Sequence, residues 1–376
     1  MHFETYPFEK LTTLLEDCKP NPKLSPIALT IGEPQFETPK FITDELCENI
    51  SLLNKYPKSA GEDYLKNAQI NFVKTRFGVE LQSSEIIPTF GTREVLFNFP
   101  QYFLFDKEDP VIAYTNPFYQ IYEGAAIASR ASVIHINLTK ENDFRPIISD
   151  EDLKKCDLVI INYPSNPTSA CIKIDEMIEL VKKAIEFDFV LINDECYSEL
   201  YFEPKNPPPS LLEASIKAGN EKFKNILVMN SISKRSSAPG LRSGFIAGDS
   251  NILKGYLQYR TYIGCAVPLP LQKAAAIAWN DENHTEEFRK TYKQNFELAK
   301  EILGIEIPQA TFYIWLEVEN ELEFTKKLYE TQNVKVLPGS FLGRNGAGKG
   351  YVRIALVENV EKTKEALLRI KAVLGR

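Results

Sequence analysis

The feature that most constrains the fold is a long alternation of short apolar runs with segments of helical periodicity, between residues 85 and 249. Short apolar runs suit buried strands, and an apolar repeat such as Ile174, Met177, Val181 and Ile185 suits one face of a helix. This order is typical of an α/β fold with a largely parallel sheet. The expected strands are 85–90, Val111–Tyr114, Val133–Leu138, Leu158–Asn162, Phe189–Asn193, Ile226–Met229 and Gly244–Ala247.

The pattern changes near residue 268, which predicts two domains. A chain of 376 residues is longer than one typical core. We expect a large domain, residues 41–267, with a mostly parallel seven-stranded sheet covered by helices. A smaller α+β domain would combine residues 1–40 with 268–376. Its expected elements are helices 271–280 and 284–303, the strand Phe312–Val318, and a final strand-helix pair, Tyr351–Ala355 and Val360–Leu374.

Composition argues against several classes of protein. A net charge of −7, from 44 Lys+Arg and 51 Asp+Glu, argues against nucleic acid as the main partner. No apolar run approaches the roughly 20 residues of a membrane helix. The first residues lack the basic start and apolar core of a signal peptide, so a cytoplasmic location is expected. The six cysteines form no Cys-x-x-Cys pair and the three histidines no ligand pattern, so we expect reduced thiols and no metal.

Polar residues follow the ends of the expected strands, where ligands bind in open α/β sheets. The most informative group is Ser231, Ser233 and Lys234, followed on a Gly/Pro turn by Arg242. A lysine amine can bond to the aldehyde of a phosphate-bearing cofactor, while hydroxyls and an arginine suit the phosphate. For this group alone, a solvated surface lysine is the competing interpretation.

Asp194, Tyr197 and Asn166 strengthen the cofactor hypothesis. A carboxylate at Asp194 would keep a pyridinium nitrogen protonated, so that the ring could accept electrons from a substrate carbanion. Tyr197 or Asn166 could hydrogen-bond the ring oxygen. Each residue has a structural alternative: a helix cap for Asp194, a turn for Asn166 and a core aromatic for Tyr197. Together with Lys234 downstream, they favour cofactor binding.

Other motifs are weaker on their own. Gly91 and Thr92 open an expected helix, whose free N–H groups suit a phosphate, although capping also explains them. Tyr119 could stack on a flat ring or simply pack. Arg353, in an alternating strand, could bind a carboxylate or form a surface ion pair. The glycine-rich segment 343–350 lacks the hydroxyl residue and helix of a Walker A motif, so we interpret it as a flexible turn.

Taken together, these motifs resemble the class I/II aminotransferases, which have the aspartate-aminotransferase-type fold (fold type I) and use pyridoxal 5'-phosphate. The match runs in order through Ile31–Pro34, Tyr56-Pro57 with Gly61, Gly91–Glu94, Asn166–Thr168, Asp194 with Tyr197, Ser231–Lys234, Gly240–Arg242 and Tyr351–Arg353. Longer segments are similar to bacterial N-succinyl-diaminopimelate aminotransferases, namely Tyr6–Leu11, Gly91–Phe97, Asn116–Gly124, Lys234–Ser236, Ser243–Phe245 and Tyr259–Ala266.

The resemblance implies a role for each residue of the expected site. Lys234 would bond covalently to the cofactor aldehyde and then act as general base and acid. Asp194 would contact the pyridine nitrogen, Asn166 and Tyr197 the ring oxygen, and Tyr119 would stack on the ring. The catalytic residues would thus be Lys234, Asp194 and Tyr197.

The remaining residues would hold the two ends of the bound molecules. The substrate α-carboxylate would bind Arg353, Asn166 and the backbone of Gly32. Tyr56 would reach the phosphate of the neighbouring subunit, which implies a homodimer with shared active sites. One departure is Ser169, where the family usually has glycine. Within one chain the phosphate would bind Gly91, Thr92, Arg93 (through its backbone N–H), Ser231, Ser233 and Arg242.

The expected activity is a pyridoxal-phosphate-dependent transamination of N-succinyl-LL-2,6-diaminopimelate with 2-oxoglutarate or glutamate, in lysine and diaminopimelate biosynthesis. Arg93 and Arg260 are candidates for the distal carboxylate of that substrate. Alternatives are an aspartate, alanine or aromatic aminotransferase, a pyridoxal phosphate β-lyase, or a cofactor-binding sensory domain of a transcription regulator. The last would need a basic winged-helix segment before the first motif, and residues 1–30 are too few and too weakly basic for one.

Overall fold

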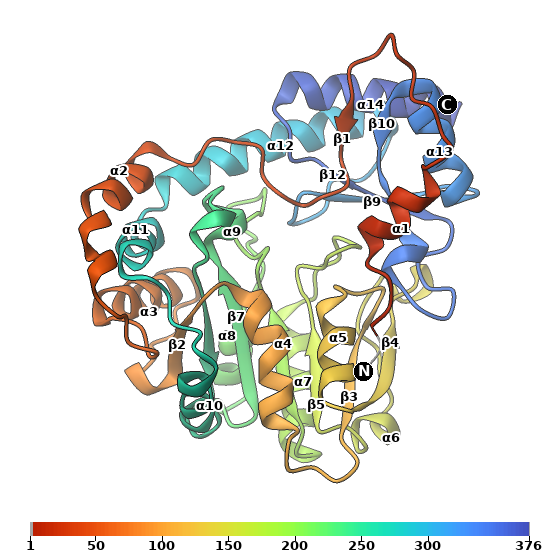
Figure 1. Ribbon diagram of the computed structural model, residues 1–376. Helices are drawn as coiled ribbons and strands as arrows, with labels where there is room; N and C mark the ends of the chain where they lie inside the picture. Colours follow the sequence, from red (N-terminus) through yellow and green to blue (C-terminus); the bar gives the residue numbers. More distant parts are fainter. Residues whose placement is uncertain (1–2, 376) are drawn as a thin grey trace.

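A seven-stranded sheet forms the centre of the larger part of the molecule in the computed structural model, which describes residues 3–375 (Figure 1). Its strand order is β2-β8-β7-β6-β5-β3-β4. The pairs β2–β8 and β8–β7 are antiparallel and the other four pairs are parallel, so the predicted mostly parallel sheet is confirmed. The strands are β2 (Ile86–Thr89), β3 (Val111–Asn116), β4 (Ser132–Asn137), β5 (Leu158–Ile161), β6 (Val190–Asp194), β7 (Ile226–Ser231) and β8 (Gly244–Gly248).

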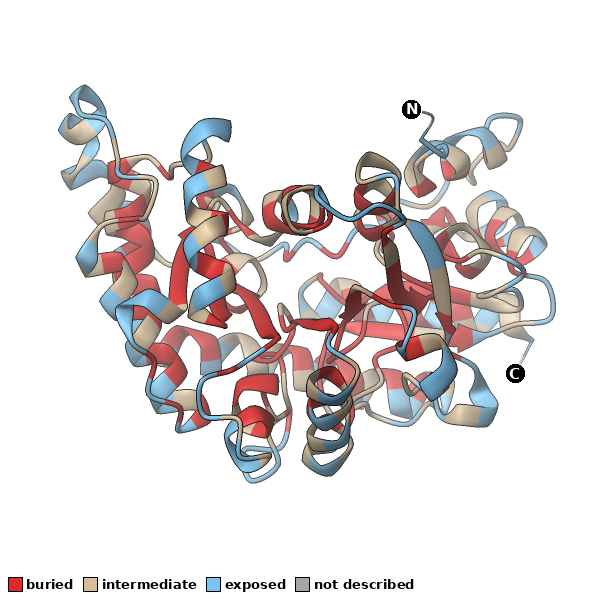
Figure 2. Ribbon diagram, turned by 90° about the horizontal axis from the view of Figure 1, so that it is seen from below, coloured by how far each residue is buried: buried red, intermediate tan, exposed pale blue. Residues whose placement is uncertain are grey.

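The central strands read as continuous apolar runs because helices cover both faces of the sheet. Along β5, Leu158 and Ile160 pack into one core cluster, while Val159 and Ile161 pack into the cluster on the opposite face. Figure 2 shows the strands as the most continuously buried part of the chain. One core contains residues of α4 (Thr92–Phe103), α5 (Ile121–Ala128) and α10 (Ser250–Ile263); the other contains residues of α3 (Asp63–Phe77), α7 (Ile174–Glu186), α8 (Leu211–Lys217) and α11 (Leu269–Asn280).

The smaller part joins segments from the two ends of the described chain, which lie side by side in Figure 1. Its three-stranded antiparallel sheet has the order β11-β12-β9, and β1 pairs in parallel with β10. The strands are β1 (Ile27–Ala28), β9 (Tyr313–Glu317), β10 (Val334–Lys335), β11 (Leu337–Pro338) and β12 (Tyr351–Ala355). The helices are α1 (Pro7–Leu14), α12 (Asn283–Leu303), α13 (Glu321–Gln332) and α14 (Val360–Leu374).

The packing of helix α11 decides where we place the domain boundary, which was expected between residues 267 and 268. Its side chains Ala274, Ala275 and Trp279 belong to the core of the large sheet, and α11 packs against α3 and α2 (Lys40–Glu48). We therefore propose that the boundary lies between α11 and α12. Residues 1, 2 and 376 of the expected small domain lie outside the described residues.

Two remaining short helices are α6 (Asp150–Leu153) and α9 (Ile232–Arg235). Among residues 3–375, no helix combines the length and the apolar character needed to cross a membrane. The same residues include no cluster of three or more histidine, cysteine or acidic side chains placed to hold a metal ion.

Candidate active site

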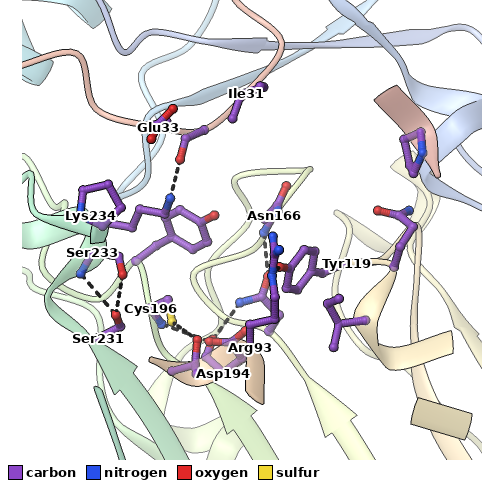
Figure 3. A pocket seen from close by; sticks show the side chains of 18 of the residues that line it. Ile31, Glu33, Arg93, Tyr119, Asn166, Asp194, Cys196, Ser231, Ser233 and Lys234 are labelled. Atoms are coloured by element: carbon purple, nitrogen blue, oxygen red, sulfur yellow. Dashed lines mark hydrogen bonds between the residues drawn. The ribbon is translucent and has the colours of Figure 1, made fainter. Parts of the chain in front are cut away.

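A cavity of ≈ 720 Å³ lies where the carboxyl ends of the large-sheet strands meet the small domain (Figure 3). Both domains line it, because the N-terminal segment and the small sheet cross over the strand ends. Most residues of the predicted site meet here, although they are spread over the whole sequence. The large domain contributes Thr92, Arg93, Tyr119, Asn166, Asp194, Tyr197, Ser231, Ser233, Lys234 and Arg242, and the small domain contributes Gly32 and Arg353.

Lys234 lies on the short helix α9, just after β7, and its amine donates a hydrogen bond to the Gly32 carbonyl oxygen. In Figure 3 the amine points toward the segment that carries Ile31 and Glu33. Burial lowers the pKa of Lys234 to about 8, and the positive charges of Arg353 and Arg93 act in the same direction. More of the amine is therefore neutral near physiological pH than in an ordinary lysine, and the neutral form is the one that a nucleophile or general base requires.

Asp194 is the last residue of β6, and its carboxylate is buried. One oxygen accepts a hydrogen bond from the Tyr122 hydroxyl at 3.2 Å, and the other accepts from the backbone N–H of Cys196 at 3.3 Å. Burial raises the pKa of Asp194 against the opposing effect of these bonds. Among the described residues no cation lies within ion-pair distance, so a protonated pyridine nitrogen fits here as the missing partner.

Arg353, in the small domain, forms hydrogen bonds with residues from two distant segments of the chain. Its guanidinium donates to Asn166 Oδ1 at 2.8 Å and to the Thr30 carbonyl oxygen at 2.6 Å. Its Nε is buried without a protein partner among the described residues. An anchored arginine with a spare donor suits a carboxylate ligand.

Tyr197 and Gly32 are both constrained by Tyr313 of β9. The hydroxyl oxygens of Tyr197 and Tyr313 are 3.1 Å apart, within hydrogen-bonding distance. A Cβ atom at Gly32 would overlap the Tyr313 hydroxyl, so only glycine fits the observed approach. The backbone of Gly32 can therefore come close to the site.

Hydroxyls, an arginine and a helix N-terminus form a cradle in the large-domain wall of the cavity. Ser231 and Ser233 have hydroxyl oxygens 2.8 Å apart, and the Arg242 guanidinium donates to the Phe90 carbonyl oxygen at 3.2 Å. Gly91 lies behind this guanidinium, where a Cβ atom would overlap it, and α4 begins at the next residue, Thr92. Cations, hydroxyls and free backbone N–H groups are the donors that a phosphate needs.

The structure of a single chain shows the surroundings of Tyr119 in the cavity, but it cannot show the contact expected between Tyr56 and a neighbouring subunit. Tyr119 lines the cavity between β3 and α5, and its hydroxyl oxygen accepts a hydrogen bond from Arg93 Nε at 2.7 Å. Tyr56 is fully exposed and does not line the cavity of its own chain. Its role in a neighbouring subunit stays a prediction.

One expectation needs correction. Arg260 is buried, pairs with Glu94 and donates to the Cys265 carbonyl oxygen at 2.8 Å, and it does not line the cavity. Its expected contact with a distal carboxylate is therefore wrong. Residues 345–350 form a turn as predicted, and Arg344 just before them binds both carboxylate oxygens of Glu123.

Sequence reasoning missed several residues of the cavity. Cys196 lies between Asp194 and Tyr197, and its sulfur is 3.2 Å from the Thr92 hydroxyl oxygen. Tyr122 was detectable in principle, because it follows Tyr119 by three residues, roughly one helical turn. The role of Tyr313 carries no comparable signal, because it arises from long-range packing. The N-terminal side chains Tyr6 and Phe8 also line the cavity.

Comparisons with known proteins agree with this geometry. Residues 25–370 match the family model described as aminotransferase class I and II. An LL-diaminopimelate aminotransferase of Maridesulfovibrio salexigens is 30% identical over 360 residues, covering 92% of this chain and 90% of the relative. The crystal structure of aminotransferase AspB from Helicobacter pylori is 51% identical with a TM-score of 0.97, covering 100% of both chains. An aminotransferase from Neisseria meningitidis is 38% identical with a TM-score of 0.95, covering 99% of this chain and 98% of the other.

The fold and the cavity together define an enzyme of the aspartate-aminotransferase fold that uses pyridoxal 5'-phosphate. More specifically, the chain belongs to the class I and II aminotransferase family. It is therefore an aminotransferase whose substrates are amino acids and 2-oxo acids. The alternative of a sensory domain without enzymatic activity is left without support.

Proposed function

We propose that this aminotransferase transfers the amino group between N-succinyl-LL-2,6-diaminopimelate and the 2-oxoglutarate/glutamate pair. The observation that carries the proposal is one continuous cavity with Lys234 and Arg353 at its reacting end. Apolar side chains of Phe8, Phe97 and Ile121 also line the cavity. Such walls suit the methylene chain of a long substrate better than the short side chains of aspartate or alanine.

The proposed roles follow from the positions of the side chains. Bound pyridoxal 5'-phosphate supplies the electron sink for the carbanion formed at the substrate Cα. Lys234 Nζ accepts the proton from this Cα and later returns a proton to complete the transfer. With its buried carboxylate, Asp194 would stabilise positive charge on the ring nitrogen, and Tyr197 would donate a hydrogen bond to the ring oxygen. Arg353, with Asn166, binds the α-carboxylate and so fixes the Cα–H bond toward Lys234.

The phosphate of the cofactor would bind in the large-domain wall of the cavity. We assign it to the backbone of Gly91, Thr92 and Arg93 at the start of α4, whose N–H groups and dipole favour an anion. Hydroxyl donors and a guanidinium complete the group. They belong to Ser231, Ser233 and Arg242.

Unmodified LL-diaminopimelate is a second candidate substrate. The name of the Maridesulfovibrio salexigens relative, LL-diaminopimelate aminotransferase, supports it. The two compounds share the reacting end and differ at the distal nitrogen, which is an amide in one and a charged ammonium in the other.

We also propose a homodimer in which Tyr56 completes the site of the partner. Tyr56 and the nearby Leu53 are large side chains exposed to solvent, as is Tyr262, and groups of exposed apolar side chains often mark interaction sites. Mixing inactive Lys234→Ala and Tyr56→Ala subunits tests this, because mixed dimers would regain one intact site. No recovery of activity would count against shared sites.

The decisive substrate test compares amino donors one at a time. The holoenzyme is incubated with 2-oxoglutarate and with N-succinyl-LL-2,6-diaminopimelate, LL-diaminopimelate, aspartate or alanine, and glutamate formation is measured. We expect the higher kcat/KM with the succinylated compound and no glutamate with the Lys234→Ala control. A higher kcat/KM with LL-diaminopimelate would favour the second candidate, and a higher value with aspartate or alanine would refute both.

A further inference from the structure

Ser169 stands where the family usually has glycine, and no step of the proposed reaction uses it. Its backbone has a φ of 60°, in the left-handed region that glycine adopts without strain. Thr311, in the small domain, has a φ of 84°, a value that β-branched residues rarely adopt. Both side chains are buried, and their hydroxyl oxygens are 2.8 Å apart. Two strained residues that meet across the two domains point to a function for their contact.

The two hydroxyls hold the backbone of Tyr313. The Ser169 hydroxyl donates to the Tyr313 carbonyl oxygen at 2.7 Å, and the backbone N–H of Tyr313 donates to Thr311 Oγ1 at 3.1 Å. Because a serine has only one O–H group, the Thr311 hydroxyl is the donor in its contact with Ser169 Oγ. Both polar backbone groups of Tyr313 therefore have a partner. They need one, because β9 lies at the edge of the small sheet.

The side chain of Tyr313 contacts residues from both sides of the proposed site. Its hydroxyl oxygen is 3.1 Å from that of Tyr197, which we assign to the ring oxygen of the cofactor. The guanidinium carbon of Arg353, which we assign to the substrate α-carboxylate, lies 4.5 Å from the centre of the Tyr313 ring. A displacement of β9 at Tyr313 would therefore disturb both contacts.

The loop that carries Ser169 also carries Asn166, whose Oδ1 accepts a hydrogen bond from Arg353 at 2.8 Å. Backbone hydrogen bonds close this loop. The N–H of Ser169 donates to the Ser165 carbonyl oxygen at 3.0 Å, and the N–H of Ser165 donates to the Ala170 carbonyl oxygen at 2.9 Å. Asn166 and Ser169 thus bind the small domain from one closed loop of the large domain.

We propose that Ser169 and Thr311 are positioning residues that hold Tyr313 against the large domain. Arg353 is thereby kept in the orientation in which it binds the substrate α-carboxylate. Neither hydroxyl residue lines the cavity, so both act through Tyr313. The inference rests on the proposed role of Arg353, but it does not depend on which amino acid is the physiological substrate. It also explains a serine at a position where glycine would be less strained, because glycine has no hydroxyl.

The test measures binding separately from the chemical step. 2-Methylglutamate has no hydrogen on its Cα, so it binds without completing the transfer, and the change in cofactor absorbance of the holoenzyme gives its Kd. For Ser169→Ala and Ser169→Gly we expect this Kd and the KM for glutamate to rise about 3- to 10-fold, as for loss of one hydrogen bond, while kcat falls less. Thr311→Val should have the same effect, whereas Thr311→Ser keeps the hydroxyl and should bind like wild type.

Thermal unfolding of the cofactor-free protein separates positioning from stability. Ser169→Gly should unfold at a higher temperature than Ser169→Ala, because only glycine removes the strain of the left-handed backbone, yet the two should share the same rise in Kd. The matched control is Ser215→Ala, which removes a buried hydroxyl that donates to the Asn220 carbonyl oxygen at 2.9 Å, away from the cavity. It should lower the unfolding temperature and leave Kd unchanged. Ser169→Gly and Thr311→Val keep the test informative if Ser169→Ala fails to fold.

The inference is overturned if the Kd for 2-methylglutamate and the KM for glutamate stay at their wild-type values in the variants that lack either hydroxyl. A merely structural role for Ser169 would give that result. Failure of the proposed function has a different signature, since the wild-type enzyme would then not use N-succinyl-LL-2,6-diaminopimelate, while the binding of 2-methylglutamate still depended on Ser169.

Discussion

The two sides of the active-site cavity are built in different ways. On the side that we assign to the cofactor, Asp194 and Ser231 end the neighbouring strands β6 and β7, and Lys234 follows β7 on the short helix α9. On the substrate side, Gly32, Tyr313 and Arg353 come from separate segments of the small domain. The cofactor side is thus fixed by local motifs on a rigid edge, while the substrate side depends on packing between distant segments.

This difference has a functional meaning. The cofactor chemistry is common to every substrate, so it can be built into the sheet edge. The substrate side includes exposed residues, such as Ile31 and Glu33, that can change without disturbing the sheet. Changes on the cofactor side should therefore affect all substrates alike, whereas changes on the substrate side should discriminate between them.

The largest effect in these comparisons is expected for Asp194→Asn. Losing the carboxylate should lower kcat by about 10²- to 10⁴-fold with every donor, because the ring nitrogen loses its charged partner. Steady-state rates with glutamate and with the proposed substrate would measure it. A loss of rate with only one donor would contradict the distinction between the cofactor side and the substrate side.

Asp194→Asn should lower activity, but we do not expect it to lower the stability of the cofactor-free protein. Burial raises the folded-state pKa of Asp194 above its unfolded value, so the charged carboxylate disfavours folding. This penalty is absent below the unfolded pKa and fully present above the folded pKa. Thermal unfolding near neutral pH should therefore show the cofactor-free Asp194→Asn protein to be at least as stable as wild type.

A smaller effect is expected for Arg353→Gln on the substrate side. Loss of charged hydrogen bonds to the α-carboxylate should lower kcat/KM about 10- to 100-fold, mainly through KM. Cofactor affinity should change little, and titration of the cofactor-free variant with pyridoxal 5'-phosphate measures this. A large loss of cofactor affinity would show that the two sides are not independent.

The pH dependence of cofactor attachment gives a finer test of the coupling between the sides. Attachment needs the neutral amine of Lys234, whose pKa is about 8 because of burial, assisted by Arg353 and Arg93. The rate in cofactor-free enzyme, followed by absorbance, should rise with pH around a midpoint near 8. Removing either positive charge favours the protonated amine, so Arg353→Gln and Arg93→Gln should move the midpoint upward, by less than about one unit.

The smallest effect is expected for Tyr313→Phe, which removes the hydroxyl next to Tyr197. Loss of one neutral hydrogen bond should reduce kcat by about 3- to 10-fold. Matched rates for Tyr313→Phe, Tyr197→Phe and the double variant measure the coupling. If the two single losses simply multiply, the contact between the hydroxyls contributes nothing to the reaction.

The same contrast explains how much could be predicted from the sequence. The seven strands of the large sheet could be located from apolar runs, because both faces of the sheet are buried. Most of the expected cofactor-side residues could be found because they follow those strands directly. The domain boundary that we propose differs from the expected one, because α11 stands next to α12 in the chain but packs into the other core. No local pattern reveals which core an apolar helix joins.

The substrate side shows more clearly what could not be predicted from the sequence. Arg93 and Arg260 were equal candidates for a distal carboxylate from the sequence, yet Glu94 neutralises Arg260 while Arg93 has only a tyrosine partner. Tyr313 was missed because its position depends on the close approach of Gly32, from the other end of the chain. Contacts of this kind are set by tertiary packing and leave no short-range signature.

The most direct test of the account is to identify the lysine that carries the cofactor. Treating the holoenzyme with borohydride makes the bond between the cofactor and its lysine permanent, and peptide mass spectrometry then locates it. We predict that the cofactor remains on Lys234 alone and is absent from the Lys234→Ala protein. Attachment to a different lysine, or no attachment in the wild-type enzyme, would contradict the central assignment of this cavity as the active site.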